Sequence, residues 1–263
     1  MIKKTALILV IILAFLLTSC APNTNPDLTA DQPEVTNAEA RYSTMNACWS
    51  SYADAEKLVE SADIVIAGII TDISFQVLDA KTALPPDEKT REENRWLHTI
   101  YDIDVITNYK GDMPNPAQIR IEGGVRDYRT EEQLALIKEM NAWPNDSIPT
   151  YGSEMPEIKI GETYLFALCT FDTGLPTNLI PQQSIYNLQD PFQKHTLDGR
   201  DVDTKYISSR TNQYGSPIIS AKDVISVFGQ DKWDAFWAQW QKDNPGWESR
   251  LDKAAVEKAL AAN

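Results

Sequence analysis

The chain has 263 residues and a formal net charge of −14, from 38 acidic and 24 basic residues. Apolar residues make up 43% of it, which is enough to bury the hydrophobic core of one large domain. An acidic chain lacks the basic surface that nucleic-acid binders carry, and anionic lipid repels it as well. We therefore exclude nucleic acid as a partner, and any membrane attachment must depend on something other than surface charge.

The first residues have the pattern of an export signal. Lys3 and Lys4 precede an unbroken apolar run over residues 6–17. As a helix, this run is about 18 Å long, which is shorter than the roughly 30 Å hydrocarbon core of a bilayer. The run therefore predicts the apolar region of a signal peptide rather than a membrane span.

The four residues that follow this run, Leu17 to Cys20, resemble the lipobox of bacterial lipoproteins. The resemblance implies a lipoprotein signal peptide over residues 1–19 and a diacylglyceryl group on Cys20, which cleavage makes the first residue. Two acyl chains give stable anchoring, so the expected location is the extracytoplasmic face of the cell membrane. The alternative is an ordinary secretory signal in which the cysteine occurs by chance.

Residues 20–45 contain three prolines and many polar residues, with no apolar periodicity. Such a segment cannot bury enough surface to offset its ordering entropy. It is therefore predicted to be a flexible tether.

Five apolar runs beyond the tether predict strands. In the run at 63–75, Ile and Val dominate and Gly68 marks a bulge or bend. The run at 158–171 is apolar on both faces, which is typical of a strand buried on both sides. The predicted strands cover residues 63–75, 96–107, 117–122, 158–171 and 179–188.

Helices are predicted where apolar residues recur at helical spacing behind a capping residue. Ser51 with Asp54, and Ser220 with Asp223, form capping-box patterns, and Thr130 is the expected cap of a third helix. Asp198-Gly199 is a hairpin-turn signal. The predicted helices cover residues 51–60, 131–142, 220–229, 231–243 and 248–262.

The order of these elements resembles a known domain. The runs ESADIVIAGIITDI, NYKGD, EGG and IKIGETYLFAL together resemble the OB-fold domain of tissue inhibitors of metalloproteinases and netrin-like modules, also found in small bacterial lipoproteins that mostly lack an assigned function. The resemblance implies a mainly β fold with added α: an OB-like five-stranded barrel with an inserted helix over residues 46–210. A C-terminal helical segment, residues 211–263, would pack on the barrel.

The inhibitors of that family present an N-terminal Cys-x-Cys to the protease zinc. Here Cys20 is followed by Ala21 and Pro22, and no second cysteine stands beside it. The resemblance therefore implies the fold and not the inhibitory activity.

The remaining cysteines, Cys48 and Cys169, are a possible disulfide pair, because an exported compartment permits the bond. The alternative is two separate buried thiols. His98 and His195 are expected to be exposed, and no known catalytic motif surrounds them. We expect no catalytic residue, no metal site and no cofactor.

An aromatic stripe follows in the C-terminal segment. Trp233, Phe236, Trp237 and Trp240 are spaced as i, i+3, i+4 and i+7, on one side of a helix. Aromatic residues at this spacing usually pack into a core. The alternative is that they bind a ligand by stacking against sugar rings.

These observations favour a lipid-anchored extracytoplasmic binding or interaction lipoprotein with no evident catalytic site. Its partners would be the membrane, through the diacylglyceryl anchor, and an envelope protein or glycan. Three alternatives remain: a glycan-binding module that uses the tryptophan-rich helix, a structural envelope component, and an envelope hydrolase. The hydrolase would use paired carboxylates such as those of Asp102, Asp104 and Glu122.

Overall fold

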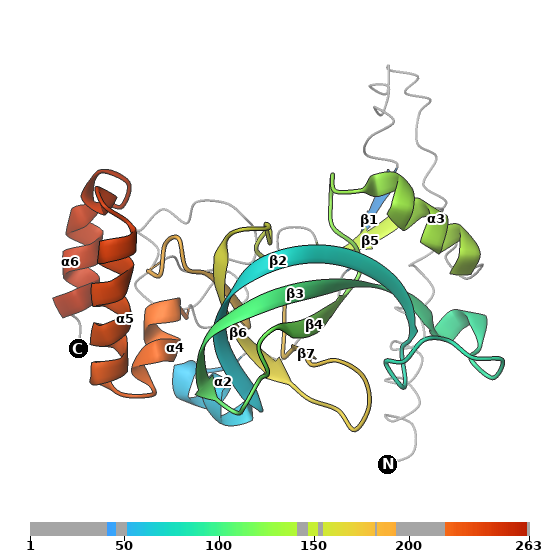
Figure 1. Cartoon of the computed structure of the whole chain (residues 1–263), viewed down its shortest axis with the longest axis horizontal. Helices are drawn as coiled ribbons and strands as arrows, with labels where there is room; N and C mark the ends of the chain where they lie inside the picture. The colour runs from blue at the N-terminus through green and yellow to red at the C-terminus, as the bar shows by residue number, and fades with distance from the viewer. Residues whose placement is uncertain are drawn as a thin grey trace, which may run out of the picture. The chain divides into compact units, whose positions relative to one another are not determined.

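The computed structural model describes residues 41–45, 52–140, 147–151, 155–181, 183–192 and 219–261 (Figure 1). The chain divides into two compact units, residues 1–37 and 38–263, and every described residue belongs to the second. Cys20, Cys48, His195 and the hairpin signal at Asp198-Gly199 lie outside the described residues. Within the described part of the chain, no helix combines the length and the apolar content that a bilayer crossing needs.

The fold is rich in sheet and mixed in class. Its main sheet has six strands in the order β2-β3-β4-β7-β6-β8, and β2 also pairs with β6. These strands are β2 (Ile64–Asp79), β3 (Arg95–Lys110), β4 (Ala117–Glu122), β6 (Thr163–Cys169), β7 (Thr177–Asn178) and β8 (Ile185–Asn187).

The two longest strands, β2 and β3, are antiparallel and curve side by side (Figure 1). The register between them shifts at Ala67/Gly68, so the predicted bulge at Gly68 is confirmed. β2 runs past the predicted end at Phe75 to Asp79, whose carboxylate accepts hydrogen bonds from Lys81 N and Thr90 Oγ1. These bonds fasten the loop that leads to the short 3-10 helix Glu92–Asn94.

The predicted strands at 158–171 and 179–188 were both too long. Before β6, Gly161 has a φ of +84°, a turn conformation that ends any continuous strand from residue 158. In the second range, Ile180 N donates to Ser184 Oγ at 2.8 Å, and this turn separates β7 from β8. Local turns therefore override the apolar pattern in both places.

A second, two-stranded sheet pairs β1 (Tyr42–Thr44) with β5 (Ile148–Thr150) in parallel. The sequence placed residues 42–44 in the tether, so the folded unit begins earlier than predicted. Three residues carry too little apolar periodicity to signal a strand, and only pairing with β5, a hundred residues later, defines this one.

The sheet has hydrophobic cores on both sides. On one side, residues of β2, β3, β4 and β6 pack with α3 (Thr130–Met140) and β5. On the other, Val65 and Ala67 of β2 and Leu165 and Ala167 of β6 pack against the helices. The prediction that the strand containing β6 is buried on both sides is confirmed.

The second core is closed by α2 (Ala55–Ser61), α4 (Ala221–Ser226), α5 (Gln230–Asp243) and α6 (Lys253–Ala261). Two lysines donate hydrogen bonds to backbone carbonyls near the C-terminal ends of α2 and α6. Lys110 Nζ donates to the carbonyls of Val59 and Glu60 near the end of α2, and Lys222 Nζ donates to the carbonyl of Ala259 in α6. Cations at these ends also oppose the negative end of the helix dipole.

Helix starts differ from the predictions in three places. The cap of α2 is Asp54, which accepts from Lys57 N. Thr130 is the first residue of α3 rather than its cap: the Arg129 carbonyl accepts from Glu132 N and Gln133 N, and the Thr130 hydroxyl pairs with that of Tyr42. α6 begins at Lys253, after the 3-10 turn Trp247–Ser249. The capping box of Ser220 and Asp223 is confirmed.

Replacing Gly68 by Ala tests the bulge. A Cβ here would lie 2.4 Å from Ile103 Cγ2 and 2.9 Å from the carbonyl oxygen of Asp104. Because that oxygen belongs to a paired strand, we expect Gly68→Ala to lower the free energy of unfolding by about 1–3 kcal/mol in urea titrations. Thr71→Ser, at an exposed position of β2, should change it by less than about 0.5 kcal/mol. An equal effect of the two variants would contradict this account of Gly68.

Candidate functional site

The aromatic stripe on α5 lies mostly inside the second core. Trp233, Trp237 and Trp240 are buried, and Phe236 is half-buried. The rings of Trp237 and Trp240 stack with centroids 5.0 Å apart, and Trp240 Nε1 donates to the carbonyl of Leu188 at 2.6 Å. The stripe therefore packs, as its spacing favoured, and it forms no open aromatic platform.

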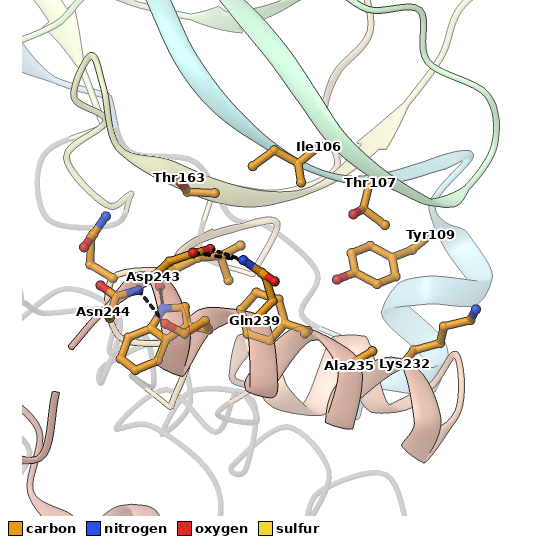
Figure 2. Close-up of a pocket in the computed structure, with 13 residues that line it drawn as sticks. Ile106, Thr107, Tyr109, Thr163, Lys232, Ala235, Gln239, Asp243 and Asn244 are labelled. Carbon is orange, nitrogen blue, oxygen red and sulfur yellow. Dashed lines mark hydrogen bonds between the residues drawn. The ribbon is translucent and has the colours of Figure 1, made fainter. Parts of the chain in front are cut away.

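A pocket of about 360 Å³ lies beside this stripe, between the sheet and α5 (Figure 2). The volume is within the range of small-ligand sites. The lining comes from the end of β3, the start of β6, the segment after β8, and α5 with Asn244. The lining residues are Ile106, Thr107, Tyr109, Thr163, Leu188, Gln189, Lys232, Ala235, Phe236, Gln239, Trp240, Asp243 and Asn244.

Apolar groups form one part of the wall. The ring of Tyr109 stacks on Phe228 with centroids 5.5 Å apart, which fixes its orientation. Phe236 and Trp240 contribute from α5, so two residues of the stripe reach the pocket. Ile106, at 58% exposure, leaves a large aliphatic side chain in contact with solvent at the pocket.

Polar groups converge on the same space. Gln239 Nε2 donates to both carboxylate oxygens of Asp243, at 2.9 and 2.8 Å, which holds the amide in place. Asn244 Nδ2 donates to the carbonyl of Trp240. The hydroxyl of Tyr109 points into the pocket (Figure 2), and burial raises the pKa of this phenol to about 12, so it keeps its proton.

Two of these groups lack an internal partner. Among the described residues, neither the Tyr109 hydroxyl nor the Gln239 carbonyl oxygen makes a hydrogen bond. Lys232 is the single cation of the lining, and its ammonium group points away from the pocket centre (Figure 2). The pocket therefore offers the Tyr109 hydroxyl, the Gln239 amide and the Asp243 carboxylate beside an apolar wall, and the Lys232 ammonium lies at its margin.

The lining has no histidine, cysteine or serine. A nucleophile beside a general base is the arrangement that covalent catalysis needs. Among the described lining residues, no hydrogen bond joins a Thr or Tyr hydroxyl to the Asp243 carboxylate or to Lys232.

Of the three acids in the hydrolase alternative, Glu122 lies far from Asp102. Asp102 pairs with Gln118, whose amide donates to it at 2.6 Å, whereas Glu122 pairs with His98. Four residues of strand separate the two positions by about 13 Å, which exceeds the spacing of a glycosidase pair. Asp104 is exposed near Asp102, and none of the three acids lines the pocket.

Glu122 is also less exposed than its place on the outer strand face suggested. Burial raises the pKa of its carboxyl, and Arg120 opposes the rise. The reason is that Arg120 draws the segment after β6 over this face: Arg120 Nε and N donate to the carbonyls of Leu175 and Pro176.

His98 was expected to be exposed, and this was wrong: it is only 3% exposed. Its Nδ1 lies 3.1 Å from the carbonyl oxygen of Trp96, and its Nε2 lies 3.3 Å from Arg120 Nη1. These partners fit a neutral ring that donates from Nδ1 and accepts at Nε2. Burial, with a contribution from the Arg120 charge, lowers the pKa of His98 to about 4.

Cys169 is a half-buried free thiol that donates to the carbonyl of Thr177 at 3.6 Å, and burial raises its pKa. Its disulfide with Cys48 stays a prediction, because Cys48 lies outside the described residues. No group of three or more His, Cys, Asp or Glu side chains that could hold a metal ion occurs within the described ranges.

Sequence reasoning missed most of the pocket. The strand predicted at 96–107 ends before Tyr109, whereas β3 continues to Lys110 and includes it. The pair Gln239 and Asp243 carried a signal, since residues four apart on a helix are neighbours. The position of the pocket depends on the docking of α5, which no local pattern specifies.

No model of a known protein family matches the chain, and no curated protein matches it in sequence.

The burial of His98 predicts an acid-sensitive contribution to stability. Its pKa is about 4 when folded and about 6.5 when unfolded, so the unfolded state binds the proton more readily between these values. Stability should fall as the pH drops from 6.5 to 4, by up to about 3 kcal/mol from this residue.

Urea titrations of wild type and His98→Gln between pH 4 and 7 check this. Both proteins should lose stability as their carboxylates are protonated. The wild type should lose up to about 3 kcal/mol more than the variant, because only it has His98. Parallel pH profiles for the two proteins would show that His98 does not contribute.

Proposed function

We propose that this protein is a lipid-anchored extracytoplasmic binding lipoprotein that takes a small ligand in the pocket between β3 and α5. The carrying observation is the pocket of about 360 Å³, where the unpaired Tyr109 hydroxyl and Gln239 carbonyl oxygen face an apolar wall. Gln239 is exposed and Tyr109 is half-buried, so a ligand in the pocket can reach the hydrogen-bonding groups of both. The same ligand would pack on Phe236, which lines the pocket beside them.

The anchor is proposed from the N-terminal sequence. The cationic start, the apolar run and Cys20 at the end of Leu17-Thr18-Ser19-Cys20 support lipidation. Loss of Lys3 and Lys4 with the signal would make the mature chain two units more negative than −14. Such a charge keeps a domain away from anionic lipid, so the acyl chains would hold the protein at the membrane and the pocket would face the envelope space.

The scaffold is proposed to be an OB-like barrel. The pairings β2–β3, β3–β4, β4–β7, β7–β6 and β6–β2 run from β2 back to β2 through five strands. Neighbours that are not consecutive in sequence, β4 with β7, are typical of a Greek-key barrel such as the OB fold. The helix α3, between β4 and β6 in the chain, corresponds to the inserted helix of the resemblance, with α4 to α6 added on the outside.

The anchor is tested by metabolic labelling with a palmitate analogue. We expect label on the wild-type protein and none on Cys20→Ala, because the diacylglyceryl group needs the sulfur of that residue. Membrane fractionation should move the variant out of the membrane fraction, while a Thr18→Ser control stays in it. Equal labelling of Cys20→Ala and wild type would refute the anchor.

The pocket is tested by filling it. Ala235 lines the pocket and is exposed, and Ala238 is exposed on the same helix without lining it. Saturation-transfer NMR with small molecules extracted from the envelope of the host should show bound signals for wild type and Ala238→Trp. Ala235→Trp should lose them by occupying the space. Signals that are the same in all three proteins would mean that ligands bind elsewhere, and no signals in any of them would contradict a binding function.

A further inference from the structure

We propose that the pocket binds an uncharged sugar ring, as part of an envelope glycan. This inference rests on the proposed binding function and names the chemical class of the ligand. A sugar ring has apolar C–H faces and hydroxyl groups around its edge, and the pocket has a matching group for each.

The apolar faces of a sugar would meet aromatic rings that the fold already holds rigid. Tyr109, which is half-buried, is fixed by its stack on Phe228, whereas Trp240 is only 6% exposed and adds little contact area. Rings that are ordered before binding contribute contact area without losing rotamer freedom. Phe236, half-buried against Trp233 with centroids 5.5 Å apart, extends the same wall.

The hydroxyl edge of a sugar would meet both donors and acceptors. The Tyr109 hydroxyl can donate, and the Gln239 carbonyl oxygen can accept. Asp243 accepts from one amide group, and an ionised carboxylate has further lone-pair sites. Thr107 and Thr163 add hydroxyl groups from the strands on the opposite wall (Figure 2).

The charge distribution argues against other small ligands. A phosphate or a carboxylate would need a cation, and the ammonium group of Lys232 points out of the pocket. A small cation would meet the Asp243 carboxylate alone, because no second acid lines the described part of the pocket. A hydrocarbon chain would leave the Tyr109 hydroxyl and the Gln239 carbonyl oxygen without partners, which costs binding free energy. A neutral ring with several hydroxyl groups has none of these mismatches.

The test uses the full chain in phospholipid nanodiscs, because maltoside detergents carry sugar heads that would compete. The probes are cellobiose and N,N′-diacetylchitobiose, with sorbitol and cyclohexanol as controls. Sorbitol has the hydroxyl groups without the ring, and cyclohexanol has the ring with one hydroxyl group. Calorimetry or ligand-observed NMR should detect at least one disaccharide and neither control at the same concentration.

Variants at the pocket make the test specific. Gln239→Ala and Tyr109→Phe should each weaken disaccharide binding about tenfold, the effect of losing one good hydrogen bond. A matched control exists on the same helix. Gln230 donates to Asp234, as Gln239 donates to Asp243, and it lies outside the pocket. Gln230→Ala should therefore leave binding unchanged.

The outcomes separate this inference from the proposed function. If neither disaccharide binds while envelope molecules still bind in a way that Ala235→Trp blocks, the pocket is a ligand site and the sugar assignment is wrong. If disaccharides bind equally to wild type, Gln239→Ala and Tyr109→Phe, the sugar site is elsewhere and the inference fails. If no molecule of any class binds, the proposed function fails with it.

Discussion

The fold depends on a constraint at β2 and β6, which are buried on both faces. Neighbouring residues of these strands point into different cores, so Ile66 belongs to one and Val65 to the other. A sheet of this kind is stable only when both sides are covered. α3 and β5 cover one side, and α2, α4, α5 and α6 cover the other. The C-terminal helices are therefore a required layer of the fold, and their positions follow from the need to cover Leu165 and Ala167.

The pocket lies where the layer of C-terminal helices stops covering the sheet. α5 places its three buried tryptophans in the core on this side of the sheet, where Trp240 bonds the carbonyl of Leu188 just after β8, and the curved strand β3 continues to Lys110. The last residues of β3 and the adjoining face of α5 then border a space that the core residues do not fill. The position of the pocket and its chemistry thus have separate causes. Packing of the cores sets where its walls lie, and Tyr109 and Gln239 supply polar groups.

The sequence allowed most of the strands and helices to be predicted, because period-two and helical spacing are local signals. It also indicated the double burial of β6 from the apolar residues on its two faces. It failed where a local bond decides the outcome, as in the turn between Ile180 and Ser184. It failed for His98 as well, because burial of that ring depends on the segment after β6, which Arg120 holds over it. The distance between Asp102 and Glu122 could not be read from the sequence either, because strand register is set by pairing rather than by spacing along the chain.

The residues on the two faces of α5 differ in how freely they can be substituted. The core residues Trp233 and Trp237 alternate along the helix with pocket residues such as Ala235 and Gln239. Substitutions on the pocket face can change ligand preference while the buried face stays intact, so specificity can drift without loss of the fold. Phe236 and Trp240 belong to both the core and the pocket, and Trp240 also bonds the backbone of Leu188. A lineage that changes its ligand would be expected to vary the pocket face of the helix and to keep this tryptophan.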